Sequence, residues 1–386
     1  MDFQLTDEQT MIRDAVRQFA EAEVAPMAAE IDREHRTPLE IIPRLAEQGL
    51  LGMFVPAEYG GAALDQLSYI IAVEELARVC ATTSVMVEAH NSLAVWPILA
   101  YGTDAQKEAL LPAMAAGEAM GAFGLTEPGA GTDVAAMTST ARPVDDGYIL
   151  NGQKVFITGG GYAKTFVVFA KTTSEGPAHR QISAFIVDRD TAGFSVGEGE
   201  RKMGIRASST PPLMFSDVYL PKDALLGREG QGFEIAMKTL DGGRIGIAAQ
   251  GLGIAQGAFE ASVDYANQRV QFGRPIGSLQ AIQWILADMS TDIEAGRLLT
   301  YRAAWLEGNG EPHAKAAAQA KLFCGQLASR VAGQAIQVHG GNGYTEAYPV
   351  ERAYRDAKIT EIYEGTNEVQ RLVIAKQVLT ERRVGA

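Results

Sequence analysis

Cysteine is scarce in this chain. The 386 residues include only two, Cys80 and Cys324, which lie far apart and have no CxxC spacing. This number and spacing argue against a disulfide-stabilised scaffold and favour a reducing environment. We therefore expect both cysteines to be small, buried hydrophobic residues.

Long apolar runs and an excess of positive charge are also missing. No stretch of about 18 apolar residues is present, which argues against a membrane span. The first residues, MDFQLTDEQTMIRD, lack the basic and apolar segments of a secretory signal. The formal net charge of −13 argues against binding to nucleic acid. We expect a cytoplasmic protein, or a mitochondrial matrix protein if it is eukaryotic and processed.

Several motifs of nucleotide binding and hydrolysis are absent as well. The sequence has no GxxxxGK[ST], HExxH or GxSxG pattern. GLGIAQG at 251–257 misses the GxGxxG spacing and follows no strand, so helix packing is the better interpretation. The five histidines show no ligand spacing, and we expect no metal site.

Three regions of different character follow one another along the chain. Residues 1–120 have helical spacing, and Thr6 and Gln9 fit a capping box at the first helix. Residues 121–230 carry the short β-rich runs KVFIT, TFVVFAK, ISAFIVD and LMFSDVYL, expected to be antiparallel because no helix separates them. Residues 231–386 are helical again and begin with one very long helix. We therefore predict a mainly α fold: an N-terminal helical domain, an antiparallel β-barrel-like middle domain and a C-terminal four-helix bundle.

Two glycine-rich segments of the β region suit contact with a ligand. In GLTEPGAGTDV, residues 124–134, Gly129 and Gly131 allow a ligand close to the backbone, and successive amides can form an anion nest. In KVFITGGG, residues 154–161, Phe156 can cover a flat ring and Thr158 can donate to it. The alternatives are a Pro-Gly turn and a strand followed by a flexible turn.

Two further segments lie in the helical C-terminal region. YANQRVQFGRP, residues 265–275, places Arg269 and Arg274 around an aromatic residue, and the arginine fork suits a diphosphate. QVHGGNGYTE, residues 337–346, breaks a helix with glycines. A solvated linker and a plain helix stop are the alternative interpretations.

The segment EIYEGTNEVQRLVIAK, residues 361–376, contains the most informative carboxylate. Thr366 is a good N-cap for the following helix, and Glu368 lies in its first turn. Glu364 precedes them, between Tyr363 and Gly365. Apolar surroundings would raise its pKa toward neutrality, as suits a general base; the alternative is a solvated loop charge.

Taken together and in this order, these motifs resemble the acyl-CoA dehydrogenases, FAD enzymes that desaturate acyl thioesters. The likeness runs from TDEQ near the N-terminus to QRLVIAK near the C-terminus, and GLTEPGAGTD and EIYEGTNEVQR are its most specific parts. The family has the same helical–β–helical fold. TLDGGRIGIAAQGLGIAQ is most similar to the short-chain, butyryl-type members.

The resemblance implies that Glu364 is the catalytic base. It would remove the pro-R α-proton while the β-hydrogen leaves as hydride to flavin N5, and the product would be a trans-2-enoyl-CoA. The thioester carbonyl would accept hydrogen bonds from the Glu364 amide and a ribityl hydroxyl of FAD. Some relatives carry their base immediately before Arg244, but this chain has Gly243 there, which strengthens the assignment to Glu364.

The resemblance also implies the FAD contacts. Thr158 would lie near N5 and Phe156 beside the ring, where many relatives have Trp. The other flavin-side residues would be Leu125, Thr126, Gly131, Thr132 and Ile157. Thr366 and Glu368 would reach FAD from their helix start. A neighbouring subunit would supply the adenosine and diphosphate contacts, which implies an oligomer, in this family most often a homotetramer. The residues concerned would be Arg269, Phe272, Gln280, Gln337, Val338, Gly340 and Gly341.

Substrate contacts and the electron acceptor follow from the same resemblance. Asp241 and Arg244 would meet the CoA part, joined in substrate binding by Thr132, Tyr363 and Gly365. Leu93 and Trp96 either close the acyl pocket or belong to the N-terminal core. Electrons would pass to an electron-transferring flavoprotein. The alternatives are an isobutyryl- or 2-methylbutyryl-CoA dehydrogenase, an acyl-CoA oxidase and a non-catalytic helical scaffold.

Overall fold

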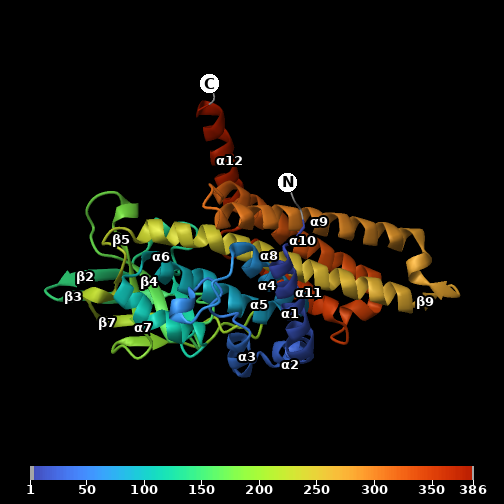
Figure 1. The fold of residues 1–386 in the computed structure, drawn as a ribbon, viewed down its shortest axis with the longest axis horizontal. Coiled ribbons are helices and arrows are strands. Elements are labelled where there is room, and N and C mark those ends of the chain that lie inside the picture. Colours follow the sequence, from blue (N-terminus) through green and yellow to red (C-terminus); the bar gives the residue numbers. More distant parts are fainter. Residues whose placement is uncertain (1–3, 385–386) are drawn as a thin grey trace.

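A β-sheet forms one end of an elongated body, and long helices run along the rest. The computed structural model describes residues 4–384 and is shown in Figure 1. The long helices α8, α9 and α10 lie side by side, and the N-terminal helices pack below them (Figure 1). The fold class predicted from the sequence, helices on both sides of a central β region, is confirmed.

The N-terminal helices start where their capping residues predict. Thr6 Oγ1 accepts from the Gln9 backbone at 3.2 Å and Gln9 Oε1 accepts from the Thr6 backbone at 3.1 Å, so the capping box is present. Two short π-helical turns, Ala20–Val24 and His90–Val95, interrupt the region. Its α-helices are α1 (Asp7–Phe19), α2 (Ala25–Glu34), α3 (Ile42–Glu47), α4 (Gln66–Val79), α5 (Ala81–Ala89), α6 (Trp96–Tyr101) and α7 (Asp104–Ala115).

The sheet is mixed rather than purely antiparallel. Its order is β6-β7-β3-β2-β4-β5-β8, with β1 beside β4. β1 pairs with β4 in parallel, and β2 meets β4 in parallel at one residue pair. A long connection between β1 and β4, about 40 residues, makes the parallel pairing possible. The strands are β1 (Gly121–Gly124), β2 (Thr140–Val144), β3 (Gly147–Lys154), β4 (Thr165–Lys171), β5 (Ile182–Asp188), β6 (Phe194–Val196), β7 (Leu213–Pro221) and β8 (Leu225–Leu226).

One predicted strand ends earlier than expected. β3 stops at Lys154, so the FIT residues of KVFIT lie outside the sheet. The Val155 amide donates to Thr126 O at 2.9 Å and the Ile157 amide to Pro211 O at 3.2 Å, both in loops. Phe156 between them has a φ of 59°, which no strand tolerates. The segment is therefore held by loop contacts rather than by a strand ladder.

The predicted long helix is present as α8, which spans Gly232–Gln268. Its glycines let neighbours approach: a Cβ at Gly251 would lie 2.9 Å from Cys324 O, and one at Gly257 would overlap Arg78 O. Helix packing is thus the correct interpretation of GLGIAQG. The remaining elements are β9 (Val270–Gln271), β10 (Arg274–Pro275), α9 (Gln280–Gly308), α10 (Ala314–His339), α11 (Pro349–Ala357) and α12 (Asn367–Val384).

The last helix leaves the body of the molecule. α12 projects away from the other helices (Figure 1) and exposes Leu372 and Leu379, at 70% and 65% of their surface. Both cysteines are buried and unpaired, as expected. Within residues 4–384, no helix combines the length and apolarity needed to cross a bilayer.

Candidate active site

The loop before α12 holds Glu364 in an unusual backbone conformation. Glu364 has a φ of 51° and Gly365 a φ of 95°, so two consecutive residues are left-handed. This conformation strains a residue with a Cβ, typically by about 1–2 kcal/mol. Such strain persists where the surrounding structure fixes it, as at functional sites.

Glu364 packs against α8 at a position that has no side chain. A Cβ added to Gly243 would overlap Glu364 Oε2 and lie 3.2 Å from Leu93 Cδ2. Gly243 therefore makes room for the carboxylate, and Leu93 borders the same space. Trp96 instead packs on Tyr101, with ring centroids 6.0 Å apart.

The surroundings of Glu364 set its protonation. Burial raises its pKa to about 7. A hydrogen bond from the Glu88 carboxyl and the charges of Lys321 and Arg244 lower the pKa and so limit that rise. Burial thus moves the pKa of Glu364 in the direction that the sequence predicted, and with its Oε2 covered the side chain is not a solvated loop charge.

Asp241 and Arg244 lie beside this loop and bind each other. Arg244 Nη1 donates to Asp241 Oδ1 at 2.5 Å, and both side chains are largely buried. A Cβ at Gly365 would lie 3.7 Å from Arg244 Nε, which has no hydrogen-bond partner within residues 4–384. Arg244 and Gly365, with Asp241 bound to Arg244, are the predicted substrate residues beside Glu364. The Nε of Arg244 remains available as a hydrogen-bond donor.

Tyr363 and Thr366 anchor the two ends of the loop. The Tyr363 hydroxyl donates to Gln250 Oε1 on α8, and Gln250 Nε2 donates to Ala81 O at 2.9 Å. Thr366 Oγ1 accepts from the Val369 amide at 3.3 Å, which confirms it as the N-cap. The loop is therefore tied to α8 and to the start of α12, where Glu368 is exposed in the first turn.

The two glycine-rich segments of the β region adjoin each other. Glu127 Oε1 accepts from Lys154 Nζ at 2.8 Å and Lys154 Nζ also donates to Leu125 O at 3.2 Å, all buried. Together with the contact of Thr126 with Val155, this pair holds the first segment against the second.

Exposure differs along these segments. Phe156 is 64% exposed and Ile157 is buried. Thr158 is half-buried, Leu125 is buried, and Gly131 and Thr132 are exposed. The aromatic face of Phe156 and the backbone at Gly131 and Thr132 are thus open to a ligand.

A cavity of about 370 Å³ is lined by residues of the two glycine-containing segments of the C-terminal region, 265–275 and 337–346. Tyr265 and His339 stack in it with ring centroids 4.3 Å apart. Four predicted cofactor residues line it: Arg269, Val338, Gly340 and Gly341. Phe272, Gln280 and Gln337 are exposed and do not line this cavity, and Phe272 is 90% exposed.

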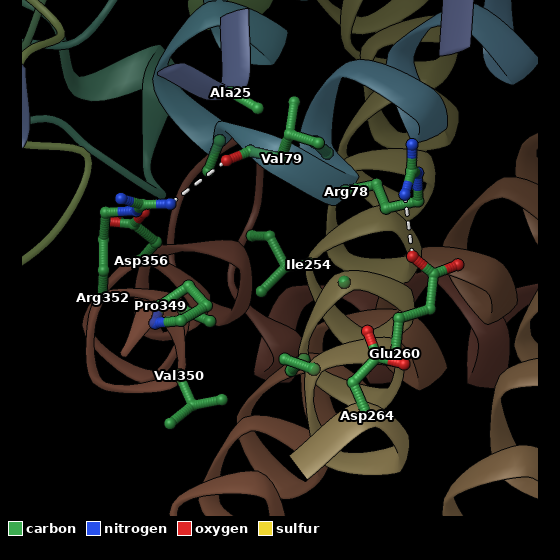
Figure 2. A pocket seen from close by; sticks show the side chains of 16 residues that line it. Ala25, Arg78, Val79, Ile254, Glu260, Asp264, Pro349, Val350, Arg352 and Asp356 are labelled. Atoms are coloured by element: carbon green, nitrogen blue, oxygen red, sulfur yellow. Dashed lines mark hydrogen bonds and ion pairs between the residues drawn. The ribbon is translucent and has the colours of Figure 1, made fainter. Parts of the chain in front are cut away.

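Another cavity, of about 330 Å³, contains none of the predicted site residues. It lies between the end of α4, α8 and α11 (Figure 2). Both of its arginines are already paired: Arg78 with Glu260 at 2.8 Å, and Arg352 with Val79 O at 3.2 Å (Figure 2). We therefore place the candidate site at Glu364. Among residues 4–384, no group of His, Cys, Asp and Glu is arranged to hold a metal ion.

Two charged residues near Glu364 were not found from the sequence. Glu88 and Lys321 are both fully buried. Burial lowers the pKa of Lys321 to about 8 while Glu364 opposes the change. Each interrupts an apolar helical run, SVMVEA and AAAQAKLFC, and such an interruption is a signal that sequence reasoning could have used.

Comparison with known proteins extends over nearly the whole chain. Three family models match it: acyl-CoA dehydrogenase N-terminal domain at 6–118, middle domain at 122–218 and C-terminal domain at 230–379. A short-chain specific acyl-CoA dehydrogenase of Clostridium acetobutylicum is 52% identical over 378 residues, covering 98% of this chain and 100% of that protein.

Two solved structures share the fold. Butyryl-CoA dehydrogenase from Megasphaera elsdenii is 47% identical with a TM-score of 0.96, covering 98% of this chain and 100% of that one. A chain from the work on the electron transferring flavoprotein of Acidaminococcus fermentans and flavin-based electron bifurcation is 50% identical. Its TM-score is 0.97, over 98% of this chain and 100% of that one.

Proposed function

This chain belongs to the acyl-CoA dehydrogenase family, and we propose that it converts a short-chain acyl-CoA to the trans-2-enoyl-CoA. Glu364 acts as the base that removes the α-proton. The electrons pass to an electron-transferring flavoprotein. The cytoplasmic location stays a prediction from the sequence.

One observation carries this proposal: a carboxylate whose pKa is raised to about 7 by burial, seated against the bare Gly243 of α8. A base works best when its pKa lies near the working pH. Gly243 gives the Glu364 carboxylate room on α8, and Leu93 beside Gly243 is an apolar neighbour suited to a short acyl chain. A base with a pKa near neutrality, Glu364, beside an apolar residue, Leu93, is suited to removing a proton from the carbon next to a thioester.

The backbone around Glu364 also suits a thioester carbonyl. No hydrogen bond within residues 4–384 occupies the Glu364 amide. An amide held in a fixed loop can donate to the carbonyl oxygen as charge moves onto it. Losing such a donor typically costs about 2.7–4 kcal/mol of barrier.

The residues present fit FAD, the cofactor of the family. The exposed face of Phe156 and the open backbone at Gly131 suit a flat ring and a phosphate. Thr158, two residues after Phe156, is half-buried and has a hydroxyl to donate. When bound there, FAD supplies the hydride acceptor for the β-hydrogen.

A second part of the cofactor would meet another subunit. Arg269 with Gly340 and Gly341 lines a cavity that suits a diphosphate or an adenosine. Exposed Phe272 and Gln337 belong to the same two segments of the chain as the cavity-lining residues, and exposed Gln280 follows the first of them. We propose a homotetramer in which these segments complete the FAD site of a neighbour, measurable by light scattering of the purified protein.

The test is a spectroscopic titration under anaerobic conditions. The purified yellow protein should be bleached by butyryl-CoA and should then reduce an electron-transferring flavoprotein. Straight-chain substrates should react faster than isobutyryl- or 2-methylbutyryl-CoA. A colourless protein would contradict the proposal, and rapid oxidation by oxygen without transfer to the flavoprotein would identify an oxidase.

A further inference from the structure

Glu88 places a second buried carboxyl group beside the base. It lies on α5, is fully buried, and is separated from Glu364 by 276 positions of sequence. Ser92 Oγ donates to Glu88 Oε1 at 2.6 Å. That bond fixes one carboxyl oxygen and leaves Oε2 for another partner.

Both carboxyl groups rest on one face of α8. A Cβ at Gly246 would lie 2.6 Å from Glu88 Oε1, and a Cβ at Gly243 would overlap Glu364 Oε2. Gly243 and Gly246 are three residues apart, so they are neighbours on the same helix face. Two bare positions of α8 therefore bring the two acids together.

Their free oxygens lack donors. Within residues 4–384, Glu88 Oε2 and Glu364 Oε2 are buried and accept no hydrogen bond. The two side chains nevertheless lie within hydrogen-bonding reach of each other. Two ionised carboxylates cannot bond, since neither has a donor. A single proton on one of them supplies the missing donor and removes the repulsion.

We propose that Glu88 and Glu364 share one proton, and that Glu88 is a positioning residue whose protonated carboxyl holds the Glu364 carboxylate ionised and aimed. The inference deepens the proposed function because it concerns the base of that reaction. No bond is made or broken in the resting pair: Glu88 donates and Glu364 accepts. When Glu364 takes up the substrate proton, it becomes the second neutral acid of the pair.

The neighbouring groups indicate which acid keeps the proton. Burial and the charge of Glu364 raise the pKa of Glu88 well above its usual value, while hydrogen bonds from Ser92 and Tyr69 oppose this. Lys321 on α10 and Arg244 on α8 favour the ionised form of Glu364.

Two nearby titratable groups leave this assignment in place. Tyr363 beside the base has its pKa raised well above its usual value by burial and by the two glutamates, so it stays neutral. His90, two residues from Glu88, is directed to Met114 O at 3.2 Å and to the Gly121 amide at 3.0 Å. Glu88 is therefore the neutral member of the pair at neutral pH.

The first measurement is the pH dependence of kcat/KM in the holoenzyme. Hydrogen bonding to the charged form lowers a pKa, so losing the Glu88 donor should raise the pKa of the base. The acid limb is the range of pH below the pKa of the base, in which kcat/KM falls. We expect Glu88→Leu to shift this limb upward by about one pH unit, so that at any pH within the limb kcat/KM is about tenfold lower than in the wild type. Glu88→Gln keeps a donor and should restore the limb.

The second measurement needs no substrate or turnover. The infrared difference between wild type and Glu88→Gln at neutral pH should contain the carbonyl band of a protonated carboxylic acid. The infrared bands of other buried acids, such as Glu74 and Glu307, are the same in both proteins and therefore cancel in the difference spectrum. The absence of the band, or an unmoved acid limb in a folded Glu88→Leu, would overturn the proposal. Normal turnover by Glu364→Gln would instead overturn the proposed function, whatever the infrared result.

Discussion

Glu127 in the β region is buried, and Glu364 before α12 is half-buried with its Oε2 covered, yet their pKa values move in opposite directions. Burial alone would raise the pKa of Glu127, but the charge of Lys154 and hydrogen bonds from Lys154, Ser139 and Thr138 hold it at about 2. Burial raises the pKa of Glu364 to about 7, and its weaker partners do not reverse this. The contrast lies in the donors that each carboxylate meets.

The two environments suit different tasks. Glu127 accepts from two backbone amides, a hydroxyl and an ammonium group, so its proton affinity is small and its position is fixed. Among the residues that the structure describes, Glu364 Oε2 has no donor and Arg244 Nε has no acceptor. A fully satisfied carboxylate holds a loop in place, while an incompletely satisfied one can accept a proton.

Removing the reactive carboxylate should have the largest effect. Glu364→Gln keeps the size of the side chain but cannot act as a base, so kcat should fall by about 10²–10⁴-fold. FAD content and acyl-CoA binding should stay near normal, as measured by absorbance and by ligand titration. Near-normal turnover would show that the base lies elsewhere.

Breaking the satisfied pair should change stability rather than chemistry. Glu127→Gln leaves the Lys154 ammonium buried without a counter-charge, which should lower the free energy of unfolding by about 3–5 kcal/mol. The measurement is chemical denaturation of the holoenzyme. The double variant Glu127→Gln with Lys154→Met removes both charges and should recover most of the loss; equal destabilisation of both variants would contradict this explanation.

Displacing the base without removing it should have an intermediate effect on rate. The methyl group of Gly243→Ala would overlap Glu364 Oε2 and force the carboxylate aside. We expect kcat/KM to fall by about 10²-fold, since small misplacements of catalytic groups cost about that much. Gly308→Ala is the matched control, because its Cβ would meet Gln66 Cβ at an ordinary 3.4 Å. Equal rates in the two variants would disprove the steric argument.

Lowering the pH should have the smallest effect on the protein, because activity should be lost at a higher pH than stability. A base must be ionised, so kcat/KM should fall about tenfold per pH unit below about pH 7. Glu127 has a lowered pKa, so its contribution to stability is complete above its unfolded value and is lost only as the pH falls toward 2. At pH 5 the protein should be folded by circular dichroism but nearly inactive, and activity should return on neutralisation. Unfolding in step with activity would contradict the separation.

The features that depend on local sequence patterns were predicted correctly. The capping box at Thr6, the N-cap at Thr366 and the length of α8 follow from residue types and spacing, and the structure has all three. The direction of the Glu364 pKa shift was also predictable, since apolar residues flank it. The detailed cofactor and substrate contacts remain predictions.

What the sequence did not predict depends on contacts between distant segments. β1 pairs in parallel with β4, and the FIT residues lie outside β3, where the amides of Val155 and Ile157 donate to the loop carbonyls of Thr126 and Pro211. Glu88 meets Glu364 only because α5 and the loop before α12 both rest on α8. No spacing within a single segment reveals such partners.

The seven glycines of α8 have a consequence for how the protein folds. Each makes a helix about 1 kcal/mol less favourable than alanine would, so α8 cut out as a peptide should be mostly unstructured. Its contacts at Gly253 with Glu74 O on α4 and at Gly251 with Cys324 O on α10 must supply what its own sequence lacks. We therefore expect early and late parts of the chain to acquire order together, and a fragment beginning near residue 231 to remain a loose coil until the first helices join it.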